Sequence, residues 1–276
     1  MLISELSTGD ISAAVGLANA VGWDDTPADW AALFSCGKVF GHRDLDGSLV
    51  GAGALCDFGP IITLAKMIVR EDVRGRGVGR AVLERCLAAR PSEATTTLLV
   101  ATPLGRLLYD RAGFVPVETV HVLMGTRSHS NSPASSRVEP FDRDDREGLL
   151  ALDRTASGGD RERMLDARLR TSKSAVVVRK GGVICGFGLA TVQRDHVVVG
   201  PVIANDVRDA HDIIDALIDE GAKVRIDVPG VQSATFRHLE AAGLEVVGSR
   251  VEMALGGRVP ACQRERRFAL ASLAYG

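Results

Sequence analysis

The sequence predicts an α/β protein in which one plan of alternating strands and helices occurs twice along the chain. Two pairs of matching segments indicate the duplication. Asp46–Cys56 and Lys180–Ala190 each resemble a strand with an embedded Gly-x-Gly, and Leu107–Gly125 resembles Phe236–Gly257 at a similar offset. A repeat at this spacing is typical of two copies of one structural unit. A chain of 276 residues is long enough for two ordinary domains.

Each half places its elements in the same order: a helical segment, strands, a turn and helix, another strand and helix, and a final strand pair. The 3.6-residue apolar period predicts helices at Arg80–Ala89, Leu104–Arg111, Ala210–Glu220 and Ser233–Ala241. Short apolar runs predict strands at Thr95–Ala101, Ala175–Arg179, His196–Ile203 and Val224–Val228. The segment Thr126–Pro140 is rich in Ser, Asn and Pro, as linkers are. We therefore expect domains at 1–127 and 140–276, joined by a linker at 128–139.

The composition predicts a cytoplasmic protein that binds neither nucleic acid nor membranes. The apolar fraction is 46% and the formal net charge is −2, which gives no overall attraction to polyanions. Five scattered cysteines without C-x-x-C spacing favour a reducing compartment and argue against a structural zinc site. The first ten residues lack a basic signal-peptide region, and no apolar run approaches the length of a membrane span.

The most informative stretch is MIVREDVRGRGVGRAVLERCLAA, from Met67 to Ala89. Glycines alternate with larger residues between an apolar strand and an amphipathic helix. A helix N-terminus carries unpaired N–H groups and partial positive charge, so it can bind an anion. Glycines before it let the backbone approach the ligand closely. The alternative is an ordinary surface turn with solvated arginines.

Two familiar phosphate-binding motifs are excluded by position. A P-loop ends in Gly-Lys-Ser/Thr, whereas Gly79 is followed by Arg80 and Ala81. A dinucleotide fingerprint that began at Gly75 would need a glycine where Arg80 stands. The glycine turn therefore belongs to neither of these two phosphate-binding motifs.

The pattern Arg74-x-x-Gly77-x-Gly79 resembles R/Q-x-x-G-x-G/A, the motif with which GNAT acetyltransferases bind the pyrophosphate of acetyl-CoA. Downstream, LLVATPLGRLLYDRAGF resembles the second signature of that family, with Tyr109 and Gly113–Phe114 at the matching positions. Thr102 stands where the family usually has Asn. The resemblance covers roughly residues 1–127.

The resemblance implies two tandem GNAT folds, each an α/β (α+β) unit whose mixed, largely antiparallel sheet has splayed central parallel strands and flanking helices. The pantetheine arm of acetyl-CoA would bind in the opening like an added strand. Carried over by position, the cofactor-binding residues are Met67, Val69, Arg74, Gly75, Arg76, Gly77, Val78, Gly79, Arg80 and Thr102. No metal is implied.

Tyr109 is the catalytic residue that the resemblance implies, because the family places this tyrosine beside the sulfur that leaves as a thiolate. The alternative is a tyrosine that only packs a helix against the sheet. A general base is not assigned: the acidic or basic side chains near the expected cleft are Asp57, Glu71, Asp72 and His121, and for each a role without catalysis is the better interpretation.

The acceptor amine is expected near GWDDTPADW (Gly22–Trp30), because this early region forms one wall of the acceptor pocket in GNAT folds. Its three aspartates and two tryptophans could receive an ammonium group by charge and by cation–π contact. The alternative is a capped helix start, which Thr26-Pro27 followed by Asp29 would also explain.

The second half resembles a GNAT domain without its cofactor site. Its turn, Ala204–Asp209, has no glycine and carries two aspartates that would repel pyrophosphate, and Leu239 replaces the tyrosine. This arrangement resembles bacterial tandem acetyltransferases whose C-terminal domain is degenerate. The second half would then close over the acceptor side of the first or serve as a buttress.

These observations predict an acetyl-CoA-dependent N-acetyltransferase that acetylates the amine of a small molecule or an amino acid. The alternatives are a protein lysine or N-terminal acetyltransferase and a non-catalytic acetyl-CoA sensor. The identity of the amine is open, and a homodimer is possible.

Overall fold

The computed structural model describes residues 2–92, 95–127, 135–256 and 262–275. The strands of the first half are β1 (Ser4–Glu5), β2 (Gly37–Arg43), β3 (Leu49–Asp57), β4 (Ile61–Val69), β5 (Thr96–Ala101) and β6 (Val115–Thr126). Its helices are α1 (Ile11–Ala20), α2 (Pro27–Cys36), α3 (Val78–Ala88) and α4 (Arg106–Arg111).

The second half repeats this order. Its strands are β7 (Val138–Pro140), β8 (Ser174–Lys180), β9 (Val183–Val192), β10 (Val197–Ala204), β11 (Lys223–Pro229), β12 (Leu244–Leu255) and β13 (Arg267–Ala269). Its helices are α5 (Arg146–Ser157), α6 (Glu162–Thr171), α7 (Val207–Leu217) and α8 (Ser233–Ala241). The helices and strands expected from periodicity are confirmed, α8 to the residue. Of the expected linker, residues 128–134 lie outside the described residues, and its end belongs to β7, which pairs with β8.

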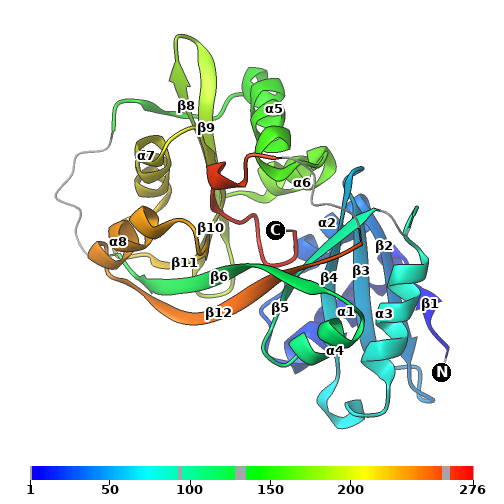
Figure 1. Ribbon diagram of the computed structural model, residues 1–276. Helices are drawn as coiled ribbons and strands as arrows, with labels where there is room; N and C mark the ends of the chain where they lie inside the picture. Colours follow the sequence, from blue (N-terminus) through cyan, green and yellow to red (C-terminus); the bar gives the residue numbers. More distant parts are fainter. Residues whose placement is uncertain (1, 93–94, 128–134, 257–261, 276) are drawn as a thin grey trace.

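Across the described ranges the strands join into one 13-stranded mixed sheet with helices on both faces (Figure 1). The order is β1-β2-β3-β4-β5-β12-β6-β11-β10-β9-β8-β7, with β13 beside β10. The long strands β6 and β12 thus each pair with the other half, β6 with β11 and β12 with β5. This exchange makes the two halves share one continuous sheet.

The embedded Gly-x-Gly of each half lets a helix pack close to the sheet. A Cβ at Gly53 would lie 2.5 Å from the Met67 sulfur and 2.9 Å from Val82 of α3. In the second half, a Cβ at Gly188 would lie 2.5 Å from Ile213 of α7. Any side chain at these positions would push the helix away, because such contacts are well inside van der Waals distance. The matching sequence segments therefore serve the same packing function.

The central parallel strands of each half separate after a short paired stretch. β4 and β5 pair only from Ile61 with Thr96 to Thr63 with Leu98, whereas β4 continues to Val69. In the second half β10 and β11 pair over Val197–Val199. The splayed central strands expected from the resemblance are confirmed, and the turn before α3 lies at the wide end of the first opening (Figure 1).

Candidate active site

Two glycines of the turn adopt the left-handed backbone conformation that favours glycine. Gly75 has φ 76° and Gly77 has φ 84°, and Gly77 is the N-cap of α3. A Cβ at either position would meet no atom within 4 Å, so the turn opens onto free space. The first intrahelical bond runs from the Ala81 N–H to the Gly77 carbonyl, which leaves the N–H groups of the preceding turn directed out of the helix. Unpaired N–H groups at the start of a helix can bind an anion.

The arginines of the turn differ in their surroundings. Arg74 donates from Nε to the Val69 carbonyl at 3.2 Å and pairs with Glu71 at 2.9 Å, so it ties the turn to the end of β4. Arg80 pairs with Glu84 on the exposed face of α3 at 2.7 Å. Arg76 is exposed. Of the three, Arg74 is therefore the one that the fold itself holds in place.

The end of β4 presents backbone polar groups to the opening. The Arg70 N–H donates to the Val50 carbonyl of β3 at 2.9 Å, and Ile68 pairs with Ala52. Because successive peptide groups of a strand point to opposite edges, those of Met67 and Val69 point away from β3 and toward the gap. The register shifts between Ala52 and Ala54, where β4 bulges at Lys66 with a φ of 50°.

Tyr109 lies on α4 and is 7% exposed. Its ring packs edge-on against Phe114 at 5.8 Å between ring centres, so it does brace helix against sheet. A Cβ at Gly105 would lie 3.0 Å from the ring, which explains the small residue there. Burial raises the pKa of Tyr109, so the phenol stays protonated at neutral pH. The Thr102 hydroxyl accepts from the Gly105 N–H at 3.2 Å and starts this helix.

On the opposite side of the first half, the α1–α2 loop contributes a buried ion pair. Lys66 and Asp25 are 2.5 Å apart, with side chains 17% and 6% exposed, and the Lys66 ammonium lies 5.3 Å from the centre of the Trp23 ring. Burial raises the pKa of Asp25, and Lys66 opposes that rise. Lys66 was not predicted from the sequence, because no sequence motif marks the strand bulge in which it lies.

Helix capping explains part of the acidic segment. The Asp29 carboxylate accepts from the Thr26 N–H at 2.9 Å and from its hydroxyl at 2.6 Å, while Thr26 caps the Asp29 N–H. Trp30 is fully buried in the core. The capping alternative thus explains Thr26 and Asp29, whereas Asp24 and Asp25 lie outside the cap.

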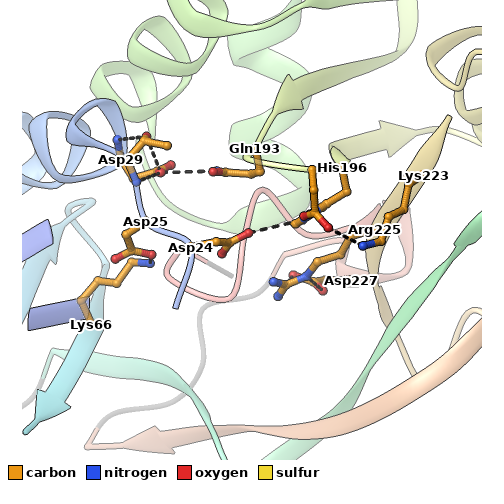
Figure 2. A network of polar contacts seen from close by, with 11 residues as sticks. Asp24, Asp25, Asp29, Lys66, Gln193, His196, Lys223, Arg225 and Asp227 are labelled. Carbon is orange, nitrogen blue, oxygen red and sulfur yellow. Dashed lines mark hydrogen bonds and ion pairs between the residues drawn. The ribbon is translucent and has the colours of Figure 1, made fainter. Parts of the chain in front are cut away.

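The second half meets this loop with polar side chains (Figure 2). Gln193 donates to Asp29 at 3.3 Å, and His196 Nε2 lies 3.5 Å from the Asp24 carboxylate. Arg225 pairs with the buried Asp227 on β11 at 3.0 Å, across the network from the Lys66–Asp25 pair. The two halves therefore enclose a region rich in charge beside the bulged part of β4.

A pocket lies where the pairing of β4 with β5 ends. Its space, open mouth included, is about 370 Å³. The first half contributes Phe58, Ile61 and Thr63 together with Leu98, Leu99 and Val100. The second half contributes Ser157, Gly159, Arg161, Glu252, Arg267 and Tyr275. Nothing in the local sequence marks the latter group, because the residues come together only through the strand exchange and the course of the C-terminal segment.

Buried charges surround this pocket in pairs. Glu252 is 1% exposed and is held by Arg264 and Arg267, which both also reach Glu118 at 3.4 Å. Arg161 pairs with Asp153 of α5 at 2.6 Å. Burial lowers the pKa of Arg264 to about 10, so it remains charged at neutral pH.

The four side chains considered as a base all have structural partners. Asp57 accepts from the Gly59 N–H in a turn at 2.9 Å. Glu71 pairs with Arg74 and Asp72 pairs with Arg70. On β6, the His121 ring is 2.9 Å from the Ser249 hydroxyl of β12. These contacts agree with roles outside catalysis.

The corresponding turn of the second half carries acidic residues, and these are paired with cations of the protein. Asp206 caps α7 by accepting from the Asp209 N–H at 2.9 Å, and it pairs with Lys180 at 2.7 Å. The fully buried Asp209 pairs with Lys180 and with Arg137, each at 2.8 Å. These contacts fill the start of α7 with cations from the protein itself.

In the described part of the chain, no three His, Cys, Asp or Glu side chains gather in a way that could hold a metal ion. Among the same residues, no helix has both the length and the apolar character needed to cross a membrane.

Two family models, both described as an acetyltransferase (GNAT) domain, match residues 38–116 and 149–269. A Bacillus subtilis (strain 168) protein named uncharacterized N-acetyltransferase YitH is 28% identical over 226 residues, which are 79% of each chain. The similarity to the models thus covers both halves of the sequence.

Solved structures show the same fold at low sequence identity. A putative acetyltransferase from Pyrococcus horikoshii has a TM-score of 0.84 at 20% identity, over 100% of this chain and 95% of its own. A tandem GNAT protein from the clavulanic acid biosynthesis pathway has a TM-score of 0.66 at 13% identity, over 92% and 97%. With a GNAT model on each half and a tandem arrangement shared with solved neighbours, the chain belongs to the GNAT acetyltransferases as a tandem member of that family.

Proposed function

We propose that the first half binds acetyl-CoA and transfers its acetyl group directly to the amine of a small molecule or an amino acid. The observation that carries the proposal is the combination of an opening between β4 and β5 with a glycine turn at its wide end. The opening begins beyond Thr63, and Gly75 and Gly77 face free space. An elongated ligand with an anionic end fits this arrangement.

The cofactor would lie along the end of β4. The peptide groups of Met67 and Val69 would bind the pantetheine arm as a neighbouring strand would, with Thr102 facing it from the end of β5. The N–H groups from Gly75 to Arg80, Val78 and Gly79 included, would bind the pyrophosphate. Arg74 would add a fixed positive charge there, and Arg76 and Arg80 would add mobile ones.

Transfer to an amine requires that the nitrogen lose its proton first. A lysine-like amine has a pKa near 10.4, so at pH 7 the deprotonation costs about 4.6 kcal/mol, at about 1.36 kcal/mol for each of about 3.4 pKa units. Burial between the two halves would supply part of that cost by disfavouring the charged amine. Water or a carboxylate would accept the proton.

The remaining steps concern the thioester. A backbone N–H of the bulged β4 would polarise the acetyl carbonyl as it develops negative charge. The amine nitrogen forms the new C–N bond, the C–S bond breaks, and Tyr109 would protonate the departing thiolate. The phenol is in the donor form at neutral pH, so it has a proton to give.

The position of the second half supports a small acceptor rather than a protein lysine. Gln193 and His196 approach the α1–α2 loop from the second half, and the pocket at the narrow end of the opening is lined by both halves. A folded protein substrate would need an open groove at this place.

Calorimetric titration of acetyl-CoA tests the cofactor site. We expect one site per chain, and we expect Gly77→Glu to abolish binding because its carboxylate and its strained backbone would both oppose the pyrophosphate. Gly47→Glu is the matched control: Gly47 has a φ of 82°, and its Cβ would also meet nothing within 4 Å, but it lies in the β2–β3 turn. Equal loss in both variants, or no binding by the intact chain, would contradict the proposal.

A panel of amines tests the acceptor class. Release of free CoA thiol with small amines or amino acids, and none with peptides that contain lysine, is the expected result. The reverse preference would favour protein acetylation.

A further inference from the structure

The C-terminal segment of the chain lies inside the opening of the second half. β10 and β11 pair only up to Val199 and Ile226, and β13 enters beyond that point. It pairs antiparallel with β10, Val202 with Ala269 and Ile203 with Arg267. On its other side the Leu270 N–H donates to the Asp227 carbonyl of β11 at 2.9 Å. The segment thus bonds to both splayed strands.

The second half is shaped to hold this segment. A Cβ at Gly200 would lie 2.0 Å from the Leu270 carbonyl oxygen, so only a glycine permits the close approach. The buried Gln232 donates to the carbonyls of Glu265 and Arg267, at 2.7 and 3.0 Å. Phe268 and Ala269 are buried in the core of this half.

The charged residues at the ends of the two openings also differ. In the first half the corresponding opening ends at a glycine turn whose two acidic residues, Glu71 and Asp72, are paired with Arg74 and Arg70. In the second half Arg266 of the segment bonds to Asn205 of the turn at 2.8 Å, and Lys180 pairs with Asp206 and Asp209 in that turn. A turn of this composition holds cations of the protein and disfavours a pyrophosphate.

The same segment reaches the first half. Arg267 and Tyr275 line the pocket at the narrow end of the β4–β5 opening. Both are buried, 4% and 5% exposed, yet Arg267 Nε and the Tyr275 hydroxyl have no hydrogen-bond partner among the described residues. Unpaired buried donors are costly unless something else satisfies them.

We propose that residues 264–275 act as a built-in ligand of the second half, occupying its acyl-CoA groove and presenting Arg267 and Tyr275 to the acetyl acceptor. The acceptor part rests on the proposed function. Arg267 is then a specificity-determining residue whose free Nε–H selects acceptors with an oxygen-bearing group, such as a carboxylate, near the amine. The groove that would hold a cofactor in the second half instead holds the segment that contributes residues to the acceptor pocket.

Hydrogen exchange of the intact chain tests the built-in ligand without any need for turnover. We expect the amides of Phe268 and Leu270 to exchange within about tenfold of the Ile226 amide in β11, with or without saturating acetyl-CoA. Fast exchange of the segment, or its release when acetyl-CoA is added, would overturn the proposal. So would a calorimetric stoichiometry of two acetyl-CoA per chain.

Steady-state kinetics test the acceptor role, with the best amino acid of the panel and the amine that lacks its carboxylate as paired substrates. We expect Arg267→Met to raise the KM for the amino acid about tenfold or more and to leave the KM of the plain amine and the Kd of acetyl-CoA within about twofold. Tyr275→Phe keeps the ring and tests the hydroxyl alone in the same way. Arg208→Met, which removes an exposed arginine of α7, is the control for loss of charge.

The outcomes separate the two proposals. Arg267→Lys keeps the positive charge, so it is the variant that should disturb folding least. A native near-UV spectrum is required of each variant. Unchanged selectivity in folded Arg267 and Tyr275 variants that still turn over would overturn the acceptor role alone. A chain that binds acetyl-CoA but acetylates no amine would overturn the proposed function and the acceptor role together, while hydrogen exchange would still decide where the segment lies.

Discussion

At the residue scale, Tyr109 is the proton donor that we propose, and Lys66 has an unusual backbone conformation. Tyr109 is buried against Phe114, which explains both its fixed position and its raised pKa. Lys66 is a non-glycine residue with positive φ, at the bulge where β4 leaves β5. Backbone strain of this kind persists only where neighbouring contacts hold it, and here Asp25 and Trp23 do so.

Tyr109→Phe should lower kcat by about 10²-fold or more, because it removes a proton donor and leaves the ring packing intact. The Kd for acetyl-CoA should stay within about twofold. Stopped-flow assays of thiol release and calorimetry measure the two quantities. If kcat is unchanged, the phenol does not donate to the thiolate. If the chain senses acetyl-CoA without turnover, no variant will differ in rate.

Lys66→Met should lower the free energy of unfolding by about 3 kcal/mol, because it leaves a buried carboxylate unpaired. Asp25 can escape part of this penalty by keeping its proton, since burial already raises its pKa. A carboxyl with a raised folded pKa loses stability as pH rises, so the deficit should grow from pH 4 to pH 7. Urea denaturation of the single variants and of Lys66→Met with Asp25→Asn measures this. Additive effects in the double variant would rule out the pair as the cause.

At the scale of elements, the packing of helices on the sheet follows from the positions of small residues. Gly53 and Gly188 let α3 and α7 approach their strands, and the same function in both halves explains why these segments match. The second half adds a polar contact between its helices. His211 of α7 stacks on His238 of α8 at 4.1 Å, and His238 bonds to Asp215 at 3.0 Å.

This histidine pair predicts acid sensitivity of the α7–α8 contact. Burial and the neighbouring His238 lower the pKa of His211 to about 4. The unfolded chain takes up a proton near pH 6.5, whereas the folded chain resists it until about pH 4, so stability should fall as pH drops through that window. His211→Gln should flatten the loss of Tm between pH 7 and pH 5. An identical pH profile for the variant would show that other groups dominate.

At the scale of the whole molecule, the two halves depend on each other because each contributes a long strand that pairs with the other half. β12 covers the edge of β5, and β6 pairs with β11 from Lys223 to Pro229. A fragment that ended after the first half would expose β5 and leave the long β6 without its partners. Exposed strand edges of this length favour aggregation.

We therefore expect the intact chain to unfold in one cooperative calorimetric transition and residues 1–127 alone to be insoluble or unfolded. Far-UV spectra and the ratio of calorimetric to van't Hoff enthalpy give the measurement. Two separate transitions, or a soluble first half with native near-UV signals, would mean that the exchanged strands contribute little.

Local sequence patterns are enough to predict the repeated α/β plan, the glycine turn and the family. These features follow from short-range rules: the apolar period, helix capping, and the need for glycine where φ is positive. The central helices and strands were predictable for this reason, as was the absence of glycines from the corresponding turn of the second half. The capping alternative for Asp29 was also available from the sequence, because all its partners lie within three residues.

Which distant residues lie close together depends on the three-dimensional packing of the chain. Lys66 meets Asp25 within the first half, Gln193 meets Asp29 across the two halves, and Arg267 of the C-terminal segment meets Glu252 of β12, and no local motif marks any of these contacts. A strand edge accepts any strand of suitable register, so no local pattern states which partner it takes. The pocket lined by both halves is a product of that choice, and for this reason the sequence predicts a cofactor site from local motifs but not the residues of the second half that line the pocket.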